Sequence, residues 1–359
     1  MSFASLPPSL LALCHDFHQR YAILEEVGVG GSGVCLRVQR RRDGFQAVAK
    51  IIAKDRVGPQ ALVRTSQWGS IPQGFTAEDD GTLVVPVEAY ALRRIRHANV
   101  VSFVDLFSCP TFYYIVMEYH GSAWRIETRE HPSSYLPSPP VTPPAQMADF
   151  PRTPSEIAAG TPSPRRPSPT PLPPAPLMRR SSSDLFEAIE KHRYFSEHLA
   201  CVIFFQIIAT VYDLFKIGIC HRDIKDENVV VDANCQVKLV DFGSCILFDP
   251  SKPAPIQHEQ RFFGTSTYAA PEVFAGKSYS IAAAEAWSLG ILLSTLLTSE
   301  HPFLSPADAA ANKRLPIKVP LSPAARDLMD RCLTVDVEKR ITLEQLRFHP
   351  WVVAQQGKP

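Results

Sequence analysis

The chain has 359 residues, of which 45% are apolar, a composition that predicts a globular protein with room for two modest domains. Its 37 basic and 36 acidic side chains leave a net charge of +1, which excludes an overall electrostatic attraction to nucleic acid or to an anionic membrane. The eight cysteines form no C-x-x-C pair and no His/Cys metal-ligand spacing, so we expect a reducing compartment, cytosol or nucleus, and no structural zinc.

Residues 1–20 precede the first predicted strand. No basic segment stands before their short apolar run, which also contains two prolines, so the segment does not have the pattern of a signal peptide. We expect an N-terminal extension that either packs on the first domain or frays.

The next stretch, YAILEEVGVGGSGVCLRVQR, predicts a strand, a glycine turn and a second strand. Gly28, Gly30 and Gly33 have G-x-G-x-x-G spacing, and glycines let a backbone approach phosphates and point its amides at them. The same spacing fits a dinucleotide-binding turn or an ordinary hairpin. A dinucleotide-binding turn opens into a helix, whereas VCLRVQR alternates like a strand, which disfavours that type.

Two charged residues follow on separate predicted elements. QAVAKII places Lys50 on a third strand, and Glu88 opens a helix-like run that continues through AYALRRIRHA. A lone lysine at the end of an apolar strand is usually an exposed edge residue. Between the two, we interpret Gly58 to Gly81 as a surface loop with no assigned role. TFYYIVMEYH then predicts a buried strand that leads into a connection.

Composition changes abruptly over residues 121–183. From Arg125 to Arg180 the chain holds 16 of its 33 prolines and seven Ser-Pro or Thr-Pro dipeptides. Such a segment cannot bury enough apolar surface to offset its ordering entropy, so we expect a disordered insert with polyproline character. The insert is either a tolerated surface insertion or a docking platform.

Ser196 to Ile217 lacks proline and glycine, which predicts a long core helix. Its most apolar part, Leu199 to Phe215, is shorter than a membrane span and carries Gln206 and Asp213. We therefore expect a buried helix and no membrane span.

The strongest chemical signal lies in two polar clusters, HRDIKDEN and VKLVDFG. The first places Asp223, Lys225 and Asn228 within six residues, and the second adds Asp241. Phosphoryl transfer from Mg-ATP to a hydroxyl requires such a set, because one group accepts the hydroxyl proton and two others hold magnesium on the phosphates. The apolar runs beside the clusters predict a strand pair, which would place both clusters at one cleft.

Together with GTSTYAAPE at residues 264–272, these motifs resemble the catalytic domain of a eukaryotic protein serine/threonine kinase, over about residues 21–353. HRDIKDEN with DFGS, the run MEYHGS and the glutamate of EAWSLG are most similar to PAS-domain kinases, within or beside the calmodulin-dependent kinase group. The resemblance implies an α+β, bilobal fold. Residues 21–120 would form a small antiparallel β-sheet lobe with one regulatory helix and the hinge. Residues 184–353 would form a larger, mainly helical lobe, followed by a short tail at 354–359.

The resemblance assigns one set of residues to ATP: Gly28, Val29, Gly30, Gly33, Cys35, Val48, Lys50, Glu88, Met117, Glu118 and His120. Within it Glu88 would pair with Lys50, Met117 would bound the back of the adenine pocket, and the backbones of Glu118 and His120 would bind the adenine edge.

In the catalytic loop, the resemblance makes Asp223 the catalytic base, and Lys225 would neutralise the transferring phosphoryl group. Asn228 and Asp241 would bind Mg²⁺. The cofactors implied are therefore ATP and Mg²⁺, and the partners are protein substrates with serine or threonine acceptors. Proline-directed kinases or proline-binding domains are the partners expected if the insert is a platform.

The resemblance also assigns substrate and structural roles. Thr265 belongs to the platform that receives the substrate peptide, and Glu272 should form a buried ion pair with Arg340. Asp184 occupies the position that arginine-directed kinases use for the residue three before the target, and Glu227 occupies another acid position used for a nearby basic residue. The two carboxylates predict a preference for arginine three residues before the target. The alternative is that Asp184 only stabilises the N-terminus of its own helix.

Two functions stay open at this point. The chain is an active protein kinase or a catalytically weak kinase-fold scaffold that works through its proline-rich insert, whereas a small-molecule kinase is disfavoured. The complete set of catalytic residues favours an active kinase over a scaffold, and GTSTYAAPE favours a protein substrate. Arg222 has no phosphoacceptor between Lys252 and Gly264, so we expect other contacts to order that loop.

Overall fold

The computed structural model describes residues 14–30, 33–120, 184–253, 256–257, 264–275 and 278–356. The insert predicted over residues 121–183 lies outside these described residues. Residues 1–13 of the predicted N-terminal extension and residues 357–359 of the tail lie outside them as well.

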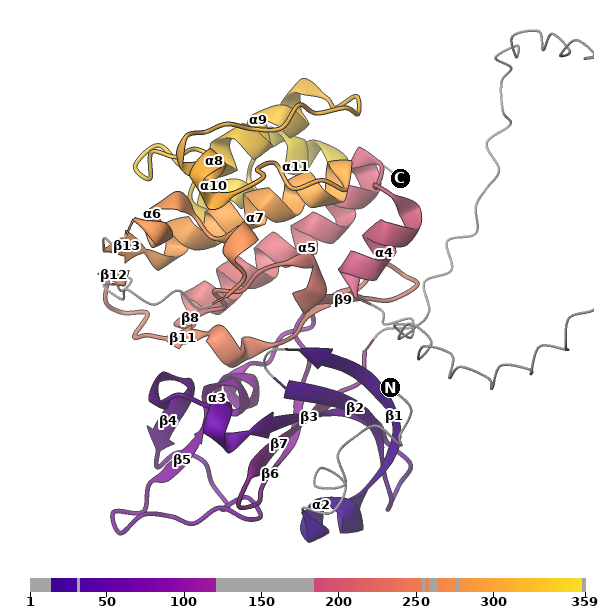
Figure 1. The fold of residues 1–359 in the computed structure, drawn as a ribbon, viewed down its shortest axis with the longest axis vertical. Coiled ribbons are helices and arrows are strands. Elements are labelled where there is room, and N and C mark those ends of the chain that lie inside the picture. Colours follow the sequence, from indigo (N-terminus) through magenta and orange to yellow (C-terminus); the bar gives the residue numbers. More distant parts are fainter. Residues whose placement is uncertain are drawn as a thin grey trace, which may run out of the picture. The chain divides into compact units, whose positions relative to one another are not determined.

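The small lobe is built on a five-stranded antiparallel sheet (Figure 1). Its strands are, in spatial order, β1 (Tyr21–Gly30), β2 (Gly33–Arg40), β3 (Gln46–Ala53), β7 (Phe112–Glu118) and β6 (Phe103–Ser108). β1 and β2 form the expected hairpin around the glycine turn, with Gly30 opposite Gly33. In β3 the side chains of Ala47, Ala49 and Ile51 are buried in the core on one side of the sheet, as the alternating pattern of a strand requires.

A short helix before the sheet belongs to this lobe. In α2 (His15–Arg20), Phe17 is fully buried and its ring stacks on Tyr21 and Tyr114 at centroid distances of 5.5 and 4.8 Å. Arg20 pairs with Asp105 of β6 at 2.6 Å. The part of the predicted extension that the structure describes therefore packs on the sheet.

The stretch from Gly58 to Gly81 differs from the surface loop that its composition predicts. It contains η3 (Pro59–Ala61) and β4 (Leu62–Thr65), and β4 pairs antiparallel with β5 (Leu83–Pro86). Trp68 is only 4% exposed and belongs to the main core. The interpretation as a surface loop is wrong for β4 and Trp68, because β4 pairs with β5 and Trp68 is buried in the core. β5 continues directly into α3 (Val87–Arg94), the single regulatory helix expected.

The large lobe is mainly helical (Figure 1). Its helices are α4 (Leu185–His192), α5 (Glu197–Lys216), α6 (Pro271–Phe274), α7 (Ile281–Thr298), α8 (Pro306–Ala310), α9 (Pro323–Cys332), α10 (Leu343–Arg347) and α11 (Pro350–Gln356). Its short strands are β8 (Ile219–Cys220), β9 (Val229–Val231), β10 (Val237–Leu239), β11 (Ile246–Leu247), β12 (Ile256–Gln257) and β13 (Tyr279–Ser280). The short 3-10 helices are η2 (Lys54–Arg56) in the small lobe and η4 (Asp226–Asn228), η5 (Phe242–Ser244) and η6 (Ser266–Tyr268) here. The predicted α+β, bilobal fold is confirmed.

Helices α5 and α7 form the centre of the large lobe. In the part of the chain that the structure describes, these two helices are long and apolar enough to cross a membrane by length and composition. Half of the most apolar window of α5 and 78% of that of α7 are buried inside the lobe, as expected for core helices. Capping residues set where helices begin: Ser196 accepts from Leu199 N at α5, and Thr342 and Gln345 form a capping box at α10.

The connection between the lobes is held by backbone and side-chain contacts. The N–H of Leu239 in β10 donates to the carbonyl of Asn99 at 2.8 Å, and Val101 N–H donates to Leu239 O at 3.2 Å. Lys238 also pairs with Glu118 at the end of β7, at 2.9 Å. The segment after α3 and the end of β7 are thereby fixed to the strand that leads into Asp241.

Candidate active site

A buried lysine joins two carboxylates at the centre of the site. Lys50 Nζ lies 2.8 Å from Glu88 Oε2 and 2.6 Å from Asp241 Oδ1, and the side chains of Lys50 and Glu88 are 4% and 2% exposed. Burial alone would lower the pKa of Lys50, but the carboxylates of Asp241 and Glu88 outweigh it and raise that pKa above its ordinary value. The lysine therefore keeps its charge inside the lobe. β3, α3 and the segment after β10 supply one residue each.

The residues predicted to contact ATP lie on the strands β1, β2, β3 and β7 around this lysine and in the segment that follows β7. Val29 is exposed between Gly28 and Gly30, at the end of β1. Gly33 has a φ of +142°, and a Cβ there would lie 2.3 Å from the carbonyl oxygen of Ile51, so the close approach of β2 to β3 requires glycine.

The residues predicted to contact adenine lie on the paired strands β3 and β7 and just after β7. Val48 lies opposite Met117 in the β3–β7 pair, and Met117 is buried, which fits a wall of the pocket. The N–H of Glu118 donates to Ser102 O at 2.8 Å, so of its two backbone groups only the carbonyl stays a candidate for the adenine edge. His120 uses its ring Nε2 to contact the carbonyl of Gln236 at 3.2 Å.

Cys35 lies directly opposite Lys50 in the β2–β3 pair, so the two side chains share a face of the sheet. Burial raises the pKa of the Cys35 thiol to about 11, although the charge of Lys50 opposes the shift. The thiol is therefore protonated at neutral pH, and protonated thiols are poor nucleophiles.

We predict that Cys35 is alkylated slowly by iodoacetamide, with a rate that rises about tenfold per pH unit through pH 9, because only the thiolate reacts. Mass spectrometry of the peptide that contains Cys35 measures the rate at each pH. A rate that levels off near pH 8 would contradict the raised pKa.

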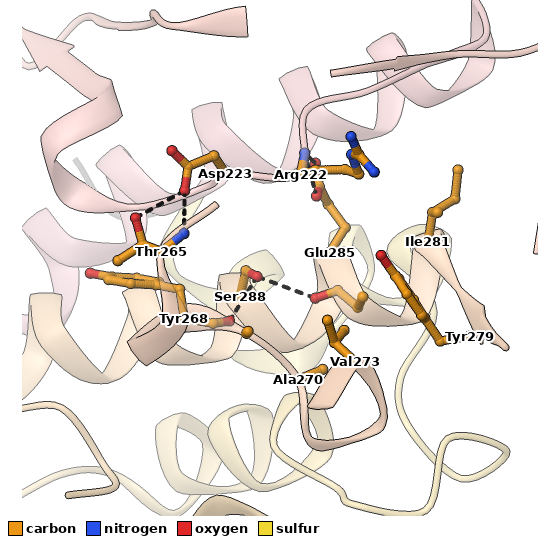
Figure 2. A pocket seen from close by; sticks show the side chains of 12 residues that line it. Arg222, Asp223, Thr265, Tyr268, Ala270, Val273, Tyr279, Ile281, Glu285 and Ser288 are labelled. Carbon is orange, nitrogen blue, oxygen red and sulfur yellow. Dashed lines mark hydrogen bonds between the residues drawn. The ribbon is translucent and has the colours of Figure 1, made fainter. Parts of the chain in front are cut away.

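Asp223 receives hydrogen bonds on both carboxylate oxygens. Thr265 donates to Oδ1 from its backbone N at 2.9 Å and from its hydroxyl at 3.0 Å (Figure 2). Asn228 donates to Oδ2 at 2.9 Å and to the Asp223 carbonyl at 2.8 Å. The carboxylate is thus fixed by residues from two of the predicted motifs. Lys225 lies 3.9 Å from Asp223 Oδ2 and 2.6 Å from Glu227.

The donor set fits magnesium held together with ATP. Mg²⁺ is usually bound by one or two protein carboxylates plus phosphate oxygens and water. Among the described residues no group of three or more His, Cys, Asp or Glu side chains could hold a metal alone. Asp241 offers a partly exposed carboxylate, and the amide nitrogen of Asn228 is used by Asp223, which leaves the amide oxygen of Asn228 for a cation. Asp241 has a left-handed backbone with φ of +60° and accepts a hydrogen bond from Gly243 N.

Glu285 supports the catalytic loop from α7. Its carboxylate accepts from the backbone N–H of His221 at 3.1 Å and of Arg222 at 3.0 Å, and it lies beside Arg222 in the pocket of Figure 2. The glutamate therefore caps the loop backbone with both of its carboxylate oxygens. Arg222 Nε also donates to Ser244 O at 2.7 Å, which ties the loop to η5.

Comparison with known proteins decides the family. The protein kinase domain family matches residues 177–352, which span the large lobe. The chain contains a serine/threonine protein kinase domain.

The sequences of three relatives match this chain over both lobes of the kinase domain. The chain is 28% identical to the serine/threonine-protein kinase PSK2 of Saccharomyces cerevisiae, over 92% of this chain and 24% of the relative. It is 27% identical to the PAS domain-containing serine/threonine-protein kinase of Mus musculus, over 95% of this chain and 19% of the relative. The serine/threonine-protein kinase prk-2 of Caenorhabditis elegans is 28% identical, over 94% of this chain and 59% of the relative. The chain thus spans less than two thirds of the length of each.

The structure adds one residue to the kinase site that sequence reasoning missed. Asp226 is a buried residue of the catalytic loop and accepts a hydrogen bond from Tyr268 of the predicted substrate platform at 3.0 Å. Burial raises the pKa of Asp226, and the Tyr268 hydroxyl opposes the shift. The contact joins the catalytic loop to the platform. An acid within a polar loop is ordinarily exposed, so HRDIKDEN contains no signal for its burial.

The two candidate substrate carboxylates of the kinase domain differ in their surroundings. Asp184 caps α4 and accepts from Glu187 N at 2.8 Å, so the helix-stabilising alternative is present in the structure. Glu227 is half exposed and pairs with Lys225.

Glu272 and Arg340 lie together as a bidentate pair in the large lobe of the kinase domain. The two guanidinium nitrogens Nη1 and Nη2 lie 2.5 and 2.9 Å from the two carboxylate oxygens. Arg340 also stacks on Trp287 at 5.0 Å and donates to the carbonyl of Ala283 at 2.8 Å. The pair therefore ties the end of the substrate platform to α7 and to the segment before α10.

Proposed function

We propose that the chain is an active protein serine/threonine kinase that transfers the γ-phosphate of Mg-ATP to serine or threonine hydroxyls of proteins. One observation carries the proposal. Lys50 contacts Glu88 and Asp241 at the same time, while Asn228 and Thr265 hold the carboxylate of Asp223. A degenerate scaffold would have no need to keep all of these contacts, so the intact site favours the enzyme.

Each residue has a chemical task in this proposal. Asp223 would accept a hydrogen bond from the substrate hydroxyl and take its proton, in place of the bonds it now receives from Thr265. Lys50 would bind phosphate oxygens, and Glu88 would orient it. Asn228 and Asp241 would hold Mg²⁺, which neutralises charge on the phosphates when it is bound. Lys225 lies near enough to Asp223 to stabilise charge on the group being transferred.

A peptide array with purified protein and Mg-ATP tests the acceptor class. We expect incorporation of phosphate into peptides with serine or threonine and none into peptides whose only hydroxyl is tyrosine. Absence of incorporation into any peptide or protein substrate, by protein that is folded and binds ATP, would favour the scaffold instead.

We further propose that arginine is preferred three residues before the acceptor, through Asp184 and Glu227. A charge-assisted pair to either carboxylate is worth about 1.5–3 kcal/mol, roughly a tenfold to hundredfold preference. Because Asp184 also caps α4, its recognition role has to be separated from its capping role. Asparagine caps helices as well as aspartate does, so Asp184→Asn removes the charge and keeps the cap.

The measurement compares two peptides, with arginine or alanine at that position, for wild type, Asp184→Asn and Glu227→Gln. We expect the arginine preference of wild type to fall about tenfold or more in at least one variant, with an unchanged melting temperature for Asp184→Asn. Equal rates for both peptides with wild type would refute the preference.

A further inference from the structure

The segment between β4 and β5 wraps around the small lobe. We call residues 66–75 the strap. Its first anchor is Trp68, which lies in the core between α3 and the sheet. The carbonyl of Trp68 accepts a hydrogen bond from Arg93 Nη2 at 2.5 Å, and Arg93 belongs to α3. The strap therefore contacts the helix that carries Glu88.

The Trp68 ring adds two further contacts to this anchor. The Arg93 guanidinium lies 4.9 Å from the centre of the Trp68 ring, in cation–π geometry. The Trp68 ring in turn meets Phe103 of β6 edge-on at 5.8 Å. Trp68 thus links the last turn of α3 to the strand that lies beside β7.

The far end of the strap is fixed to the same sheet. Ser108 N–H of β6 donates to Gln73 O at 3.0 Å, and Phe75 stacks on Tyr113 of β7 at 5.7 Å. Gly74 has a φ of +78°, and a Cβ there would lie 1.7 Å from Ser108 O, so the close approach requires glycine. The strap is therefore held at both ends and cannot shift as a free loop would.

Helix α3 needs such support because it is short. It has eight residues, and no side chain caps its N-terminus at Pro86. Helices of this length are unstable alone in water, so tertiary contacts set their position. Glu88 lies in the first turn of α3 and reaches Lys50, whereas Arg93 lies near its end and reaches Trp68. The two contacts hold the helix at opposite ends.

We propose that Trp68 is a positioning residue that acts through Arg93 and α3 to hold Glu88 against Lys50. Because the contacts of Trp68 with Arg93 and Phe103 lie wholly within the small lobe, they keep the ion pair of Lys50 and Glu88 formed without a partner protein. This proposal rests on the proposed kinase function for its effect on rate, and its effect on the position of α3 is independent of that function.

The experiment uses the full chain with four substitutions. Trp68→Ala removes the ring and its contacts with Arg93 and Phe103 but keeps the carbonyl that accepts from Arg93. Trp68→Phe keeps an aromatic ring for Arg93, and Arg93→Met keeps the length of the side chain but removes its charge and hydrogen bond. The control is Phe17→Leu, which loosens a different core cluster of the same lobe, without contact to α3.

Hydrogen exchange of the ligand-free protein is the first readout. We expect faster amide exchange across Val87–Arg94 in Trp68→Ala and Arg93→Met, and wild-type exchange there in Trp68→Phe and Phe17→Leu. Unchanged exchange of α3 in Arg93→Met would overturn the proposal even if Trp68→Ala fails to fold.

A double-mutant cycle on kcat is the second readout. We expect Trp68→Ala to lower kcat about 10- to 100-fold when it is the only substitution, which is the rate loss that a misplaced catalytic group causes. In a Glu88→Gln background, the same substitution should have little further effect on kcat. Equal losses in both backgrounds would show a general structural role and overturn the proposal. If wild type transfers no phosphate, the proposed function fails while hydrogen exchange still decides the role of Trp68.

Discussion

Asp223→Asn is expected to lower kcat by about 10²-fold or more while it leaves the affinity for ATP unchanged. An amide cannot take the proton of the substrate hydroxyl. An amide also has only one oxygen that can accept hydrogen bonds. In Asp223 both carboxylate oxygens accept, one from Thr265 and the other from Asn228. Steady-state kinetics with a serine peptide measure kcat, and calorimetric titration measures ATP binding.

The matched control is Asp232→Asn. Asp232 accepts from the N–H groups of Asn234 and Gln236 in the turn between β9 and β10, and it has no part in the site. The same chemical change there should leave kcat as it is in wild type. Near-normal phosphorylation by Asp223→Asn would show that Asp223 is not the base.

Glu272→Ala is expected to lower the free energy of unfolding by about 3–5 kcal/mol, because it leaves the buried charge of Arg340 without its partner. The Arg340 side chain is 0% exposed and that of Glu272 is 14% exposed, so water cannot replace the lost carboxylate. Urea denaturation, analysed as a two-state transition, measures the free energy of unfolding of the wild type and of the variant.

An exposed pair of the same lobe provides the control. Glu300 and Lys318 lie 2.7 Å apart, with side chains 43% and 69% exposed. Glu300→Ala should cost about 0–1 kcal/mol, as exposed ion pairs do. Similar losses for Glu272→Ala and Glu300→Ala would contradict a structural role for the buried pair.

The sequence predicted local chemistry well because the residues concerned are close together in the chain. Asp223, Lys225 and Asn228 share one loop, so their meeting depends on a few backbone angles. The Thr-x-x-Gln pattern of Thr342 and Gln345 is local in the same way, and in the structure the two residues form a capping box. The pairing of Lys50 with Glu88 was available only from the family resemblance, since 37 residues separate them.

Features that depend on distant partners could not be predicted in this way. The strap has a loop-like composition of Gly, Ser, Pro and Gln, and its tryptophan becomes a core residue only because Arg93 and Phe103 reach it. Phe17 likewise lies in a segment predicted to pack or fray, and aromatic residues far along the chain bury it. Asp226 is a third case, because its burial depends on Tyr268.

Transfer of the γ-phosphate from radiolabelled ATP to a serine peptide, by wild type and Asp241→Ala, tests the proposed active site most directly. Wild type should phosphorylate the peptide with Mg²⁺ and lose all transfer when a chelator removes the metal. Asp241→Ala should show no transfer at any Mg²⁺ concentration, because the carboxylate that would hold the metal and that contacts Lys50 is gone. Metal-dependent transfer by Asp241→Ala at the wild-type rate, or none by folded wild type, would contradict the proposed site.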